Sequence, residues 1–440
     1  MSTRAEAPGG AGEGHAEGGS QRDSSKLLVL SLVPFLMVLG NSMLIPVLPK
    51  LMAVLHVTLL QAGLVITVFS IPAGIVIPFA GALSDRVGRK IVMVPALAVY
   101  GFAGLGAGLS SWLLPHAYAY IIGFRILQGI GAGGTYQLAM ALAGDMYRSQ
   151  QRVRALGTLE ASNGLGKVAS PIAGSAVALL VWFAPFFVYG ILSFPVAAAV
   201  WMAIREPKDR LAAATLGQYW QGLRRVFQRK GASLLVTFLG GATVLFILFG
   251  VLSYLADILE RPYGLREMPR GLLIAVPVLF SALASYLAGT VMQARLARWS
   301  RPVVAGGLGL IGLAMVAEAL IFNPFWVMPA LVFQGIGTGA VLPAINTLVT
   351  SATSTSERGV VTSLYGSVRF FGVALGPPIF ALAMRARPII FLGAAGLAFA
   401  VAALSWWLIN EQQMLPRQLQ PRDAAPPARR GLRVRRRQPT

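Results

Sequence analysis

The 440-residue sequence contains no cysteine, and only 12% of its residues are charged. Without cysteine there can be no disulfide bond and no thiolate metal site. The histidines His15, His56 and His116 are far apart and lack metal-ligand spacing. The sequence has no phosphate-binding loop, no zinc signature and no convincing nucleophile–base pair. It therefore predicts neither an enzyme nor a protein that holds a metal or a cofactor.

Most of what is present is apolar. Hydrophobic residues make up 56% of the chain, and the charged fraction is about half of the ~25% that is typical of soluble domains. The sequence predicts a multi-span membrane protein. The net charge of +21 alone would suggest nucleic acid as a partner, but the bases occur in short clusters between apolar runs and near the end of the chain. Nucleic acid is therefore not expected to bind.

Apolar runs long enough to cross the membrane recur along the chain. A bilayer core of ~30 Å requires about 20 residues of helix, in which every backbone polar group is paired. Twelve such spans are expected. They are Leu27–Leu48, Leu59–Ala82, Ile91–Ser110, Ala117–Ala143, Ala155–Leu180, Pro185–Ile204, Ser233–Leu259, Gly271–Gln293, Pro302–Ile321, Pro324–Val349, Gly359–Met384 and Pro388–Ile409.

The basic loops orient these spans in the cell membrane. Short loops rich in Lys and Arg stay in the cytoplasm, and such loops follow the second, fourth and eighth spans. Both termini are therefore expected in the cytoplasm. The expected organisation is a disordered tail (1–26), a six-helix bundle (27–204), a linker with an amphipathic segment (205–232), a second six-helix bundle (233–410) and a basic tail (411–440).

The two bundles are related in sequence. "LQGIGAGG" (Leu127–Gly134) matches "FQGIGTGA" (Phe333–Ala340), and the same register pairs Gly166 with Gly372 and Pro171 with Pro377. Parallel six-helix repeats are typical of carriers with a cavity at the repeat interface, near the bilayer midplane. Such carriers expose the cavity alternately to the two sides of the membrane.

Four short motifs add a family resemblance. "GALSDRVGRK" (Gly81–Lys90) and "FRILQGIGAG" (Phe124–Gly133) resemble the loop and fourth-helix signatures of the major facilitator superfamily. "IPVLP" (Ile45–Pro49) and "GLGKVASPIAGS" (Gly164–Ser175) are similar to patterns in its twelve-helix drug:proton antiporter branch. The resemblance extends from Leu27 to about Ile409, and it implies an all-α membrane protein with two pseudo-symmetric six-helix bundles.

The resemblance also implies roles for charged residues at the inner ends of the helices. The loop motif would act as a latch that stabilises the outward-facing state. An alternative is that its bases only keep the loop in the cytoplasm, but that role needs neither the acid nor the glycines. The latch residues are Gly81, Asp85, Arg86, Gly88, Arg89 and Lys90, together with Asp145 at the inner end of the fourth span.

Small residues and prolines in the fifth and eleventh spans predict close helix packing. Taken alone they could simply pack the bundle, but their recurrence in both halves favours helices that also bend or slide, because proline loosens the helical hydrogen bonds. They are Gly166, Ser170, Pro171 and Gly174, with Gly372, Gly376 and Pro377 in the second half.

Charged residues inside the spans are expected to face a cavity, because each cation there costs ~2.5–3.5 kcal/mol. The resemblance links Arg125 to proton coupling. Glu160 and Asp257 are the candidate proton-binding acids, and Glu160 shares a helix face with Lys167. The first span offers only Asn41 where a related antiporter carries an acid. The expected cavity residues are Asn41, Gln128, Tyr136, Asn163, Lys167, Tyr254, Asn346 and Arg369.

The sequence therefore predicts a monomeric secondary active transporter, surrounded by membrane lipids, that exports an amphiphilic small molecule in exchange for protons. The first alternative is a carrier of a lipid headgroup, an organic anion or another metabolite, which Lys167, Arg369 and the missing acid favour. A multi-span membrane enzyme or sensor would need a reactive cluster or an extra domain, and neither is visible.

Overall fold

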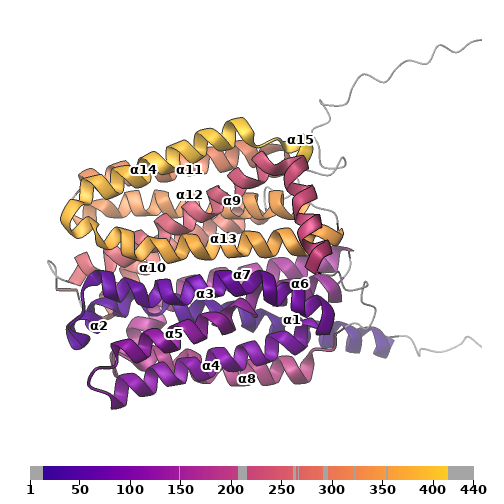
Figure 1. Cartoon of the computed structure of the whole chain (residues 1–440), viewed down its shortest axis with the longest axis horizontal. Coiled ribbons are helices and arrows are strands. Elements are labelled where there is room, and N and C mark those ends of the chain that lie inside the picture. Colours follow the sequence, from indigo (N-terminus) through magenta and orange to yellow (C-terminus); the bar gives the residue numbers. More distant parts are fainter. Residues whose placement is uncertain are drawn as a thin grey trace, which may run out of the picture.

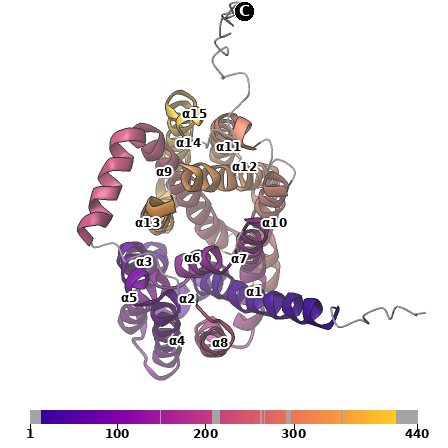
Figure 2. The same ribbon diagram turned by 90° about the vertical axis from the view of Figure 1, so that its right-hand side faces the viewer.

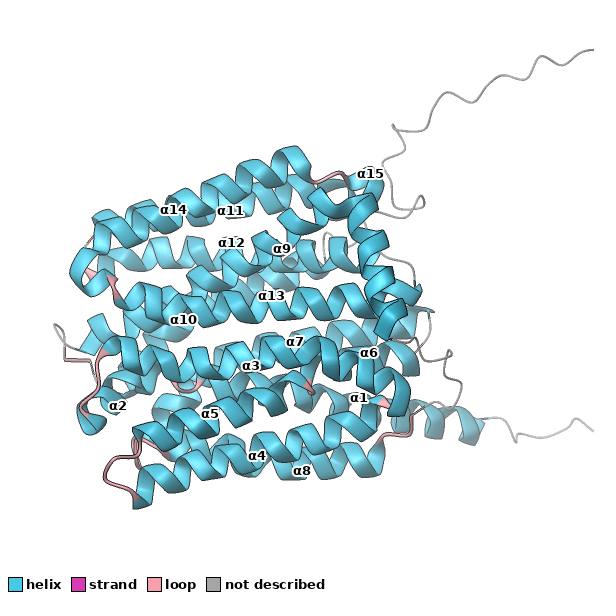
Figure 3. Cartoon of the chain, viewed as in Figure 1, coloured by secondary structure: helices cyan, strands magenta, loops and turns pink. Residues whose placement is uncertain are grey.

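The computed structural model describes residues 13–147, 149–206, 216–260, 264–265, 267–290, 296–321, 323–352 and 355–414. These residues form helices joined by loops, and within them no strand is present (Figures 1 and 3). The helices are α1 (Glu13–Ser42), η1 (Ile45–Val47), α2 (Leu48–Leu55), α3 (Leu59–Val87), α4 (Arg89–Leu113), α5 (Tyr118–Gly133), α6 (Tyr136–Met146), α7 (Ser149–Ala178), α8 (Ala184–Ala203), α9 (Leu216–Glu260), α10 (Glu267–Thr290), α11 (Leu296–Leu320), α12 (Pro324–Ser351), α13 (Thr355–Ala381), α14 (Ala383–Leu408) and α15 (Glu411–Met414).

The predicted spans fall on helices, and ten helices of the described residues are long and apolar enough to cross a membrane. The fourth predicted span is divided into α5 and α6 by a break at Gly134 and Thr135, and the fifth falls on α7, which begins with the polar sequence SQQRVR. These two spans are not among the ten. The all-helical membrane fold is confirmed, and the number twelve stays a prediction.

The helices begin earlier than the sequence suggested at two places. α1 starts at Glu13, within the predicted disordered tail, and α9 starts at Leu216, within the predicted linker. An existing helix extends without a new nucleation cost, so a spanning helix can continue beyond the bilayer core. Figure 2 shows the first turns of α9 lying across the end of the bundle, where the amphipathic segment was expected. Residues 1–12 and 415–440 of the predicted tails lie outside the described residues.

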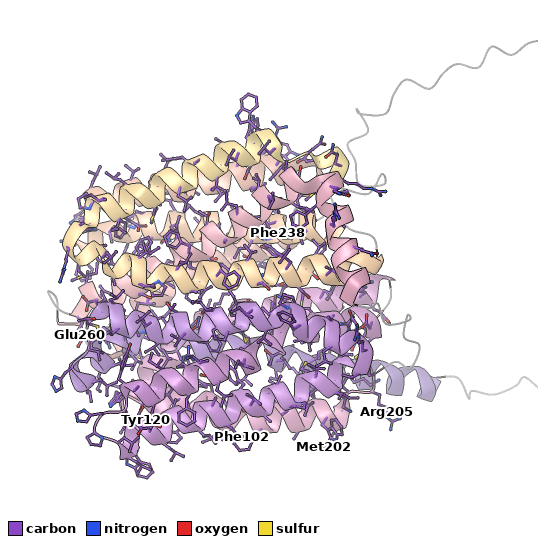
Figure 4. The ribbon with its side chains drawn as sticks, viewed as in Figure 1. Phe102, Tyr120, Met202, Arg205, Phe238 and Glu260 are labelled. Atoms are coloured by element: carbon purple, nitrogen blue, oxygen red, sulfur yellow. The ribbon has the colours of Figure 1, made fainter. Side chains whose placement is uncertain are left out.

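The helices form two bundles that lie side by side (Figure 1). In the first bundle, α4 packs against α5 and α8, and α1 packs against α7. In the second bundle, α11 packs against α12 and α14, and α9 packs against α13. Large apolar side chains cover the outside: Phe102 and Met202 are 64% and 76% exposed and lie at the surface (Figure 4). Such a surface suits a protein that is surrounded by lipid.

Two helix pairs join the bundles, α3 with α13 and α7 with α10. The sequence repeat relates α3 to α10 and α7 to α13, so exchanging the bundles turns one pair into the other. On α3, Gly63 lies against Pro377 and Gly81 lies against Ser363, which brings the two helices into contact near both ends. The interface therefore has the two-fold pseudosymmetry that the repeat implies.

Within each bundle, glycines bring corresponding helices together. A Cβ atom at Gly174 of α7 would lie 2.2 Å from the carbonyl oxygen of Met43, directly after α1. A Cβ at Gly372 of α13 would lie 2.3 Å from the carbonyl oxygen of Ala242 on α9. Gly166 and Gly376 make similar approaches to Phe35 and Phe246. α7 thus packs on the α1 segment as α13 packs on α9.

We predict that Gly174→Ala lowers the thermal stability of the purified protein by several degrees, because the new methyl group would overlap backbone atoms, and overpacking costs about 1–3 kcal/mol. Gly164→Ala, on the same helix, is the matched control, since a Cβ there meets nothing within 4 Å. Thermal unfolding in detergent measures both variants. Equal stability of the two would contradict the close packing of α7.

Candidate functional site

A cavity lies between the two bundles. It encloses about 600 Å³, and its walls come from α1, α3, α6, α7, α9 and α13. The apolar wall includes Phe69, Phe249 and Phe370, and charged and amide side chains form the rest. The lining residues are Met37, Val38, Asn41, Ser42, Phe69, Tyr136, Gln137, Asn163, Lys167, Leu245, Phe249, Gly366, Arg369, Phe370 and Val373.

The break between α5 and α6 shapes one side of this cavity. Because the fourth predicted span is interrupted, Tyr136 and Gln137 form the first turn of α6, and both line the cavity. The hydroxyl of Tyr136 donates a hydrogen bond of 2.6 Å to Oε1 of Glu160 on α7. The carboxylate that the sequence marked as a proton-binding candidate is therefore attached to the cavity wall.

Two cations from opposite bundles line the cavity. Lys167 comes from α7 and Arg369 from α13. The charge of Lys167 interacts with those of Arg369 and Glu160. The Arg369 guanidinium lies 5.5 Å from the centroid of the Tyr365 ring. The structure thus brings together three charged groups that are distant in the sequence.

Arg125 is fully buried behind the cavity wall. Its Nε donates to the carbonyl oxygen of Val65 (2.9 Å), and its Nη1 donates to the carbonyl of Gly40 (2.8 Å) and to Oε1 of Gln128 (2.7 Å). Its Nη2 donates to Oδ1 of Asn41 at 3.1 Å. Among the described residues, these acceptors are all neutral oxygens. Arg125 therefore connects α1, α3 and α5, and it contacts the cavity lining through Asn41 and the ring of Phe69.

The latch residues lie together at one end of the first bundle. Arg89 contacts Asp85 at 3.0 Å and Asp145 at 2.5 Å, so it connects α3, α4 and α6. Gly88 adopts a φ of 119°, which favours glycine, at the turn between α3 and α4. Arg86 is exposed at the same end.

Glu206, which the sequence analysis did not identify, holds the start of α4. Its carboxylate accepts hydrogen bonds from the backbone N–H groups of Arg89 (2.8 Å) and Lys90 (3.3 Å). Lys90 in turn donates to the carbonyl oxygen of Ile204 at 2.8 Å. A carboxylate is favourable at a helix N-terminus. The signal in the sequence was an acid directly after the sixth span, on the same side as the basic loop.

A second, smaller pocket of about 320 Å³ lies beside the latch and includes Asp85, Arg89, Thr362 and Ser363. Gln137 lines both this inner pocket and the central cavity. A Cβ atom at Gly366 of α13 would lie 2.6 Å from Nε2 of Gln137, so the absence of a side chain at Gly366 makes room for the amide. Gln137 is therefore shared by the linings of the two pockets.

Several expected site residues lie elsewhere. Within the described residues, Asn41, Tyr136, Asn163, Lys167 and Arg369 line the cavity. Three other predicted cavity residues do not line it: Gln128 binds Arg125, Tyr254 packs on the Phe391 ring, and Asn346 lies on α12, which packs against α10 and α11.

Asp257 is also separate from the cavity lining. It is fully buried on α9 and interacts with the charge of Arg270 and with Tyr254. Glu160 is therefore the predicted proton-binding acid that lies beside the cavity.

Two pseudo-symmetric helical bundles with a cavity between them define a membrane transporter of the alternating-access type. Comparison with known proteins identifies the family. The chain belongs to the Major Facilitator Superfamily, whose family model matches residues 30–377 and 314–440. The resemblance found in the sequence is confirmed. The protein is a multi-pass membrane transporter and not an enzyme.

Curated relatives include exporters. The chain is 38% identical to the bacillibactin exporter of Bacillus subtilis (strain 168), over 83% of this chain and 92% of the relative. It is 29% identical to a multidrug efflux protein of the same organism, over 77% and 81% of the two chains. A class B tetracycline resistance protein of Escherichia coli is 25% identical over 82% and 88%.

Solved structures share the fold at low sequence identity. A human organic anion transporter superposes with a TM-score of 0.68 at 17% identity, over 87% of this chain and 99% of the other. A D-xylose–proton symporter superposes with a TM-score of 0.69 at 14% identity, over 89% and 99%. At these identities the likeness concerns the fold alone.

Proposed function

We propose that this protein exports an amphiphilic small molecule from the cytoplasm by alternating access, with the central cavity as its binding site. The observation that carries this proposal is the cavity itself, which combines an apolar wall with a few convergent polar groups at the interface of the bundles. The relatives that are exporters support the direction of transport. Bacillibactin, named for the 38% identical relative, is the first compound to test for transport.

The arrangement in the membrane is part of the proposal. With the latch and both termini in the cytoplasm of a bacterial cell, the inner pocket faces the side from which substrate would enter. The positive-inside distribution of Lys and Arg supports this orientation. Purified protein reconstituted into proteoliposomes tests the function directly: uptake above that of protein-free vesicles is expected for a transported compound.

Exchange for protons is the first candidate for the driving force. Glu160 is the proposed proton-binding group, because this acid lies at the cavity wall and its carboxylate accepts a hydrogen bond from Tyr136. A neutral or cationic substrate would compete with a proton for the same carboxylate, and such competition couples the two movements. Arg125 would act indirectly, through its hydrogen bond to Asn41.

We predict that Glu160→Gln reduces substrate accumulation driven by a pH gradient at least about tenfold, because a side chain that is positioned to transfer a proton accelerates its reaction by about that much or more. Downhill exchange of substrate should persist, because the cavity keeps its shape. Asp257→Asn, which removes a buried acid away from the cavity lining, is the matched control and should retain pH-driven accumulation. If Asp257→Asn lost pH-driven accumulation and Glu160→Gln kept it, the coupling acid would be Asp257 on α9.

Export of an organic anion is the second candidate function. The specific observation in its favour is that the charged residues lining the cavity, Lys167 and Arg369, are both cations. An anion would not compete with a proton at Glu160, so this candidate requires a different driving force.

A further inference from the structure

We infer that the transported molecule carries an anionic group that binds between Lys167 and Arg369, and that the membrane potential drives its export. The inference deepens the second candidate function and rests on the proposal that this cavity is the transport site. The proposed anion site contains one cation from each bundle.

The charges around the cavity do not balance without a ligand. Lys167 and Arg369 contribute +2, and Glu160, held at the wall by Tyr136, contributes −1. Arg125, buried behind the wall on neutral oxygens, adds a further positive charge, so cations are in excess. An uncompensated cation within a membrane protein is expensive, and such residues face a partner or a water-filled cavity. A bound anionic group would offset part of this excess.

Lys167 has donors available for such a group. Within the described part of the chain, its ammonium group makes no hydrogen bond or ion pair, although it lies near Glu160 and Arg369. The planar guanidinium of Arg369 matches the geometry of carboxylate, phosphate and sulfonate groups. The two side chains together can therefore hold an anionic group from two sides.

The first turn of α6 adds to this positive potential. α6 begins at Tyr136, its first two residues line the cavity, and the residue before it, Thr135, provides no side-chain cap. The N–H groups in the first turn of a helix attract negative charge.

The rest of the wall fits an apolar body attached to the anion. Phe69, Phe249 and Phe370 line the same cavity, and Phe69 and Phe370 lie with their ring centroids 6.5 Å apart. An aromatic or aliphatic body would pack on these rings while its anionic group contacts the cations. The inferred substrate class is therefore an amphiphilic organic anion with one net negative charge at the site.

The same charge sum determines the response to voltage. A bound monovalent anion lowers the positive charge that moves with the cavity by one. The empty carrier therefore holds one more positive charge than the loaded carrier, and a potential that is negative inside favours its return to the cytoplasmic side. Each cycle thus exports one negative charge without requiring a proton.

Two probes with the same body and opposite charges test this inference: pyrene sulfonate and pyrenemethylammonium. We expect the purified full-length protein to bind the sulfonate about tenfold more tightly, which reflects one well-placed charge-assisted contact. Lys167→Gln and Arg369→Gln should each weaken sulfonate binding about tenfold, and Lys167→Arg should restore most of it. Equal affinity for both probes, or variants that bind the sulfonate like the wild type, would overturn the inference.

Glu160→Gln gives a test that misfolding cannot imitate. Removal of the competing negative charge should strengthen sulfonate binding several-fold. Unchanged or weaker binding would contradict the charge sum. In proteoliposomes, a potential that is positive inside should drive sulfonate uptake without a pH gradient, and uptake that follows only the pH gradient would refute the voltage dependence. Failure of every tested compound to cross, with sulfonate binding intact, would instead refute the proposed export function and leave the anion site standing.

Discussion

Replacement of Arg125 by glutamine is expected to abolish transport and to reduce the stability of the first bundle. The guanidinium group satisfies the carbonyl oxygens of Gly40 and Val65 and the amide oxygens of Asn41 and Gln128. A shorter amide cannot reach these acceptors, and each buried acceptor that loses its donor costs about 1–3 kcal/mol. Thermal unfolding in detergent and transport in proteoliposomes measure the two effects.

Arg154→Gln is the matched control for this substitution. Arg154 is exposed at the inner end of α7, so the same change of side chain should leave stability and transport close to the wild type. Arg125→Lys keeps the charge but loses the planar set of donors, and it should recover only part of the stability. Wild-type stability in Arg125→Gln would show that the hydrogen bonds of Arg125 are not needed to hold α1, α3 and α5 together.

Arg89→Gln is expected to slow transport about tenfold or more, because it removes charge-assisted contacts to two carboxylates. Substrate binding should stay near the wild-type affinity. Arg89 contacts both Asp85 and Asp145, which belong to different helices. Its removal would destabilise one end state of the transport cycle, and Arg89 does not line the central cavity. Asp85→Asn should have a similar effect, because it removes one of the same contacts.

Arg205→Gln provides the comparison at the same end of the molecule. Arg205 is exposed (Figure 4) and adjoins Glu206, but removal of its charge breaks none of the contacts of Arg89 described above. If Arg89→Gln and Arg205→Gln transported equally well, the latch motif would serve only to orient the loop in the membrane.

The fold was predictable from the sequence because its determinants are local or repeated. Length and apolarity identify the spanning helices, and the match of Leu127–Gly134 with Phe333–Ala340 reveals the pseudosymmetry. The break between α5 and α6 was not predicted, since Gly134 and Thr135 fall within one continuous predicted span. Its effect is considerable, because it places Tyr136 and Gln137 at a helix start inside the molecule.

The site was predictable only in part, because the direction of a side chain depends on how each helix is rotated by its neighbours. Lys167 and Arg369 were expected to share a cavity because a buried cation needs one, and both line it. Asn346 gave the same polar signal, but it lies on α12, which packs against α10 and α11. The contact between Glu206 and the start of α4 joins residues 117 positions apart, and no local pattern encodes it.

The position of Gln137 has a consequence for leakage. Gln137 lines both the central cavity and the inner pocket, and its flexible side chain is seated against Gly366. Side chains change rotamer in picoseconds to nanoseconds, whereas bundles move in microseconds to milliseconds. The rotamer of Gln137 can therefore change many times within one transport cycle, and leakage of water between the two pockets would depend on this side chain as well as on the bundles.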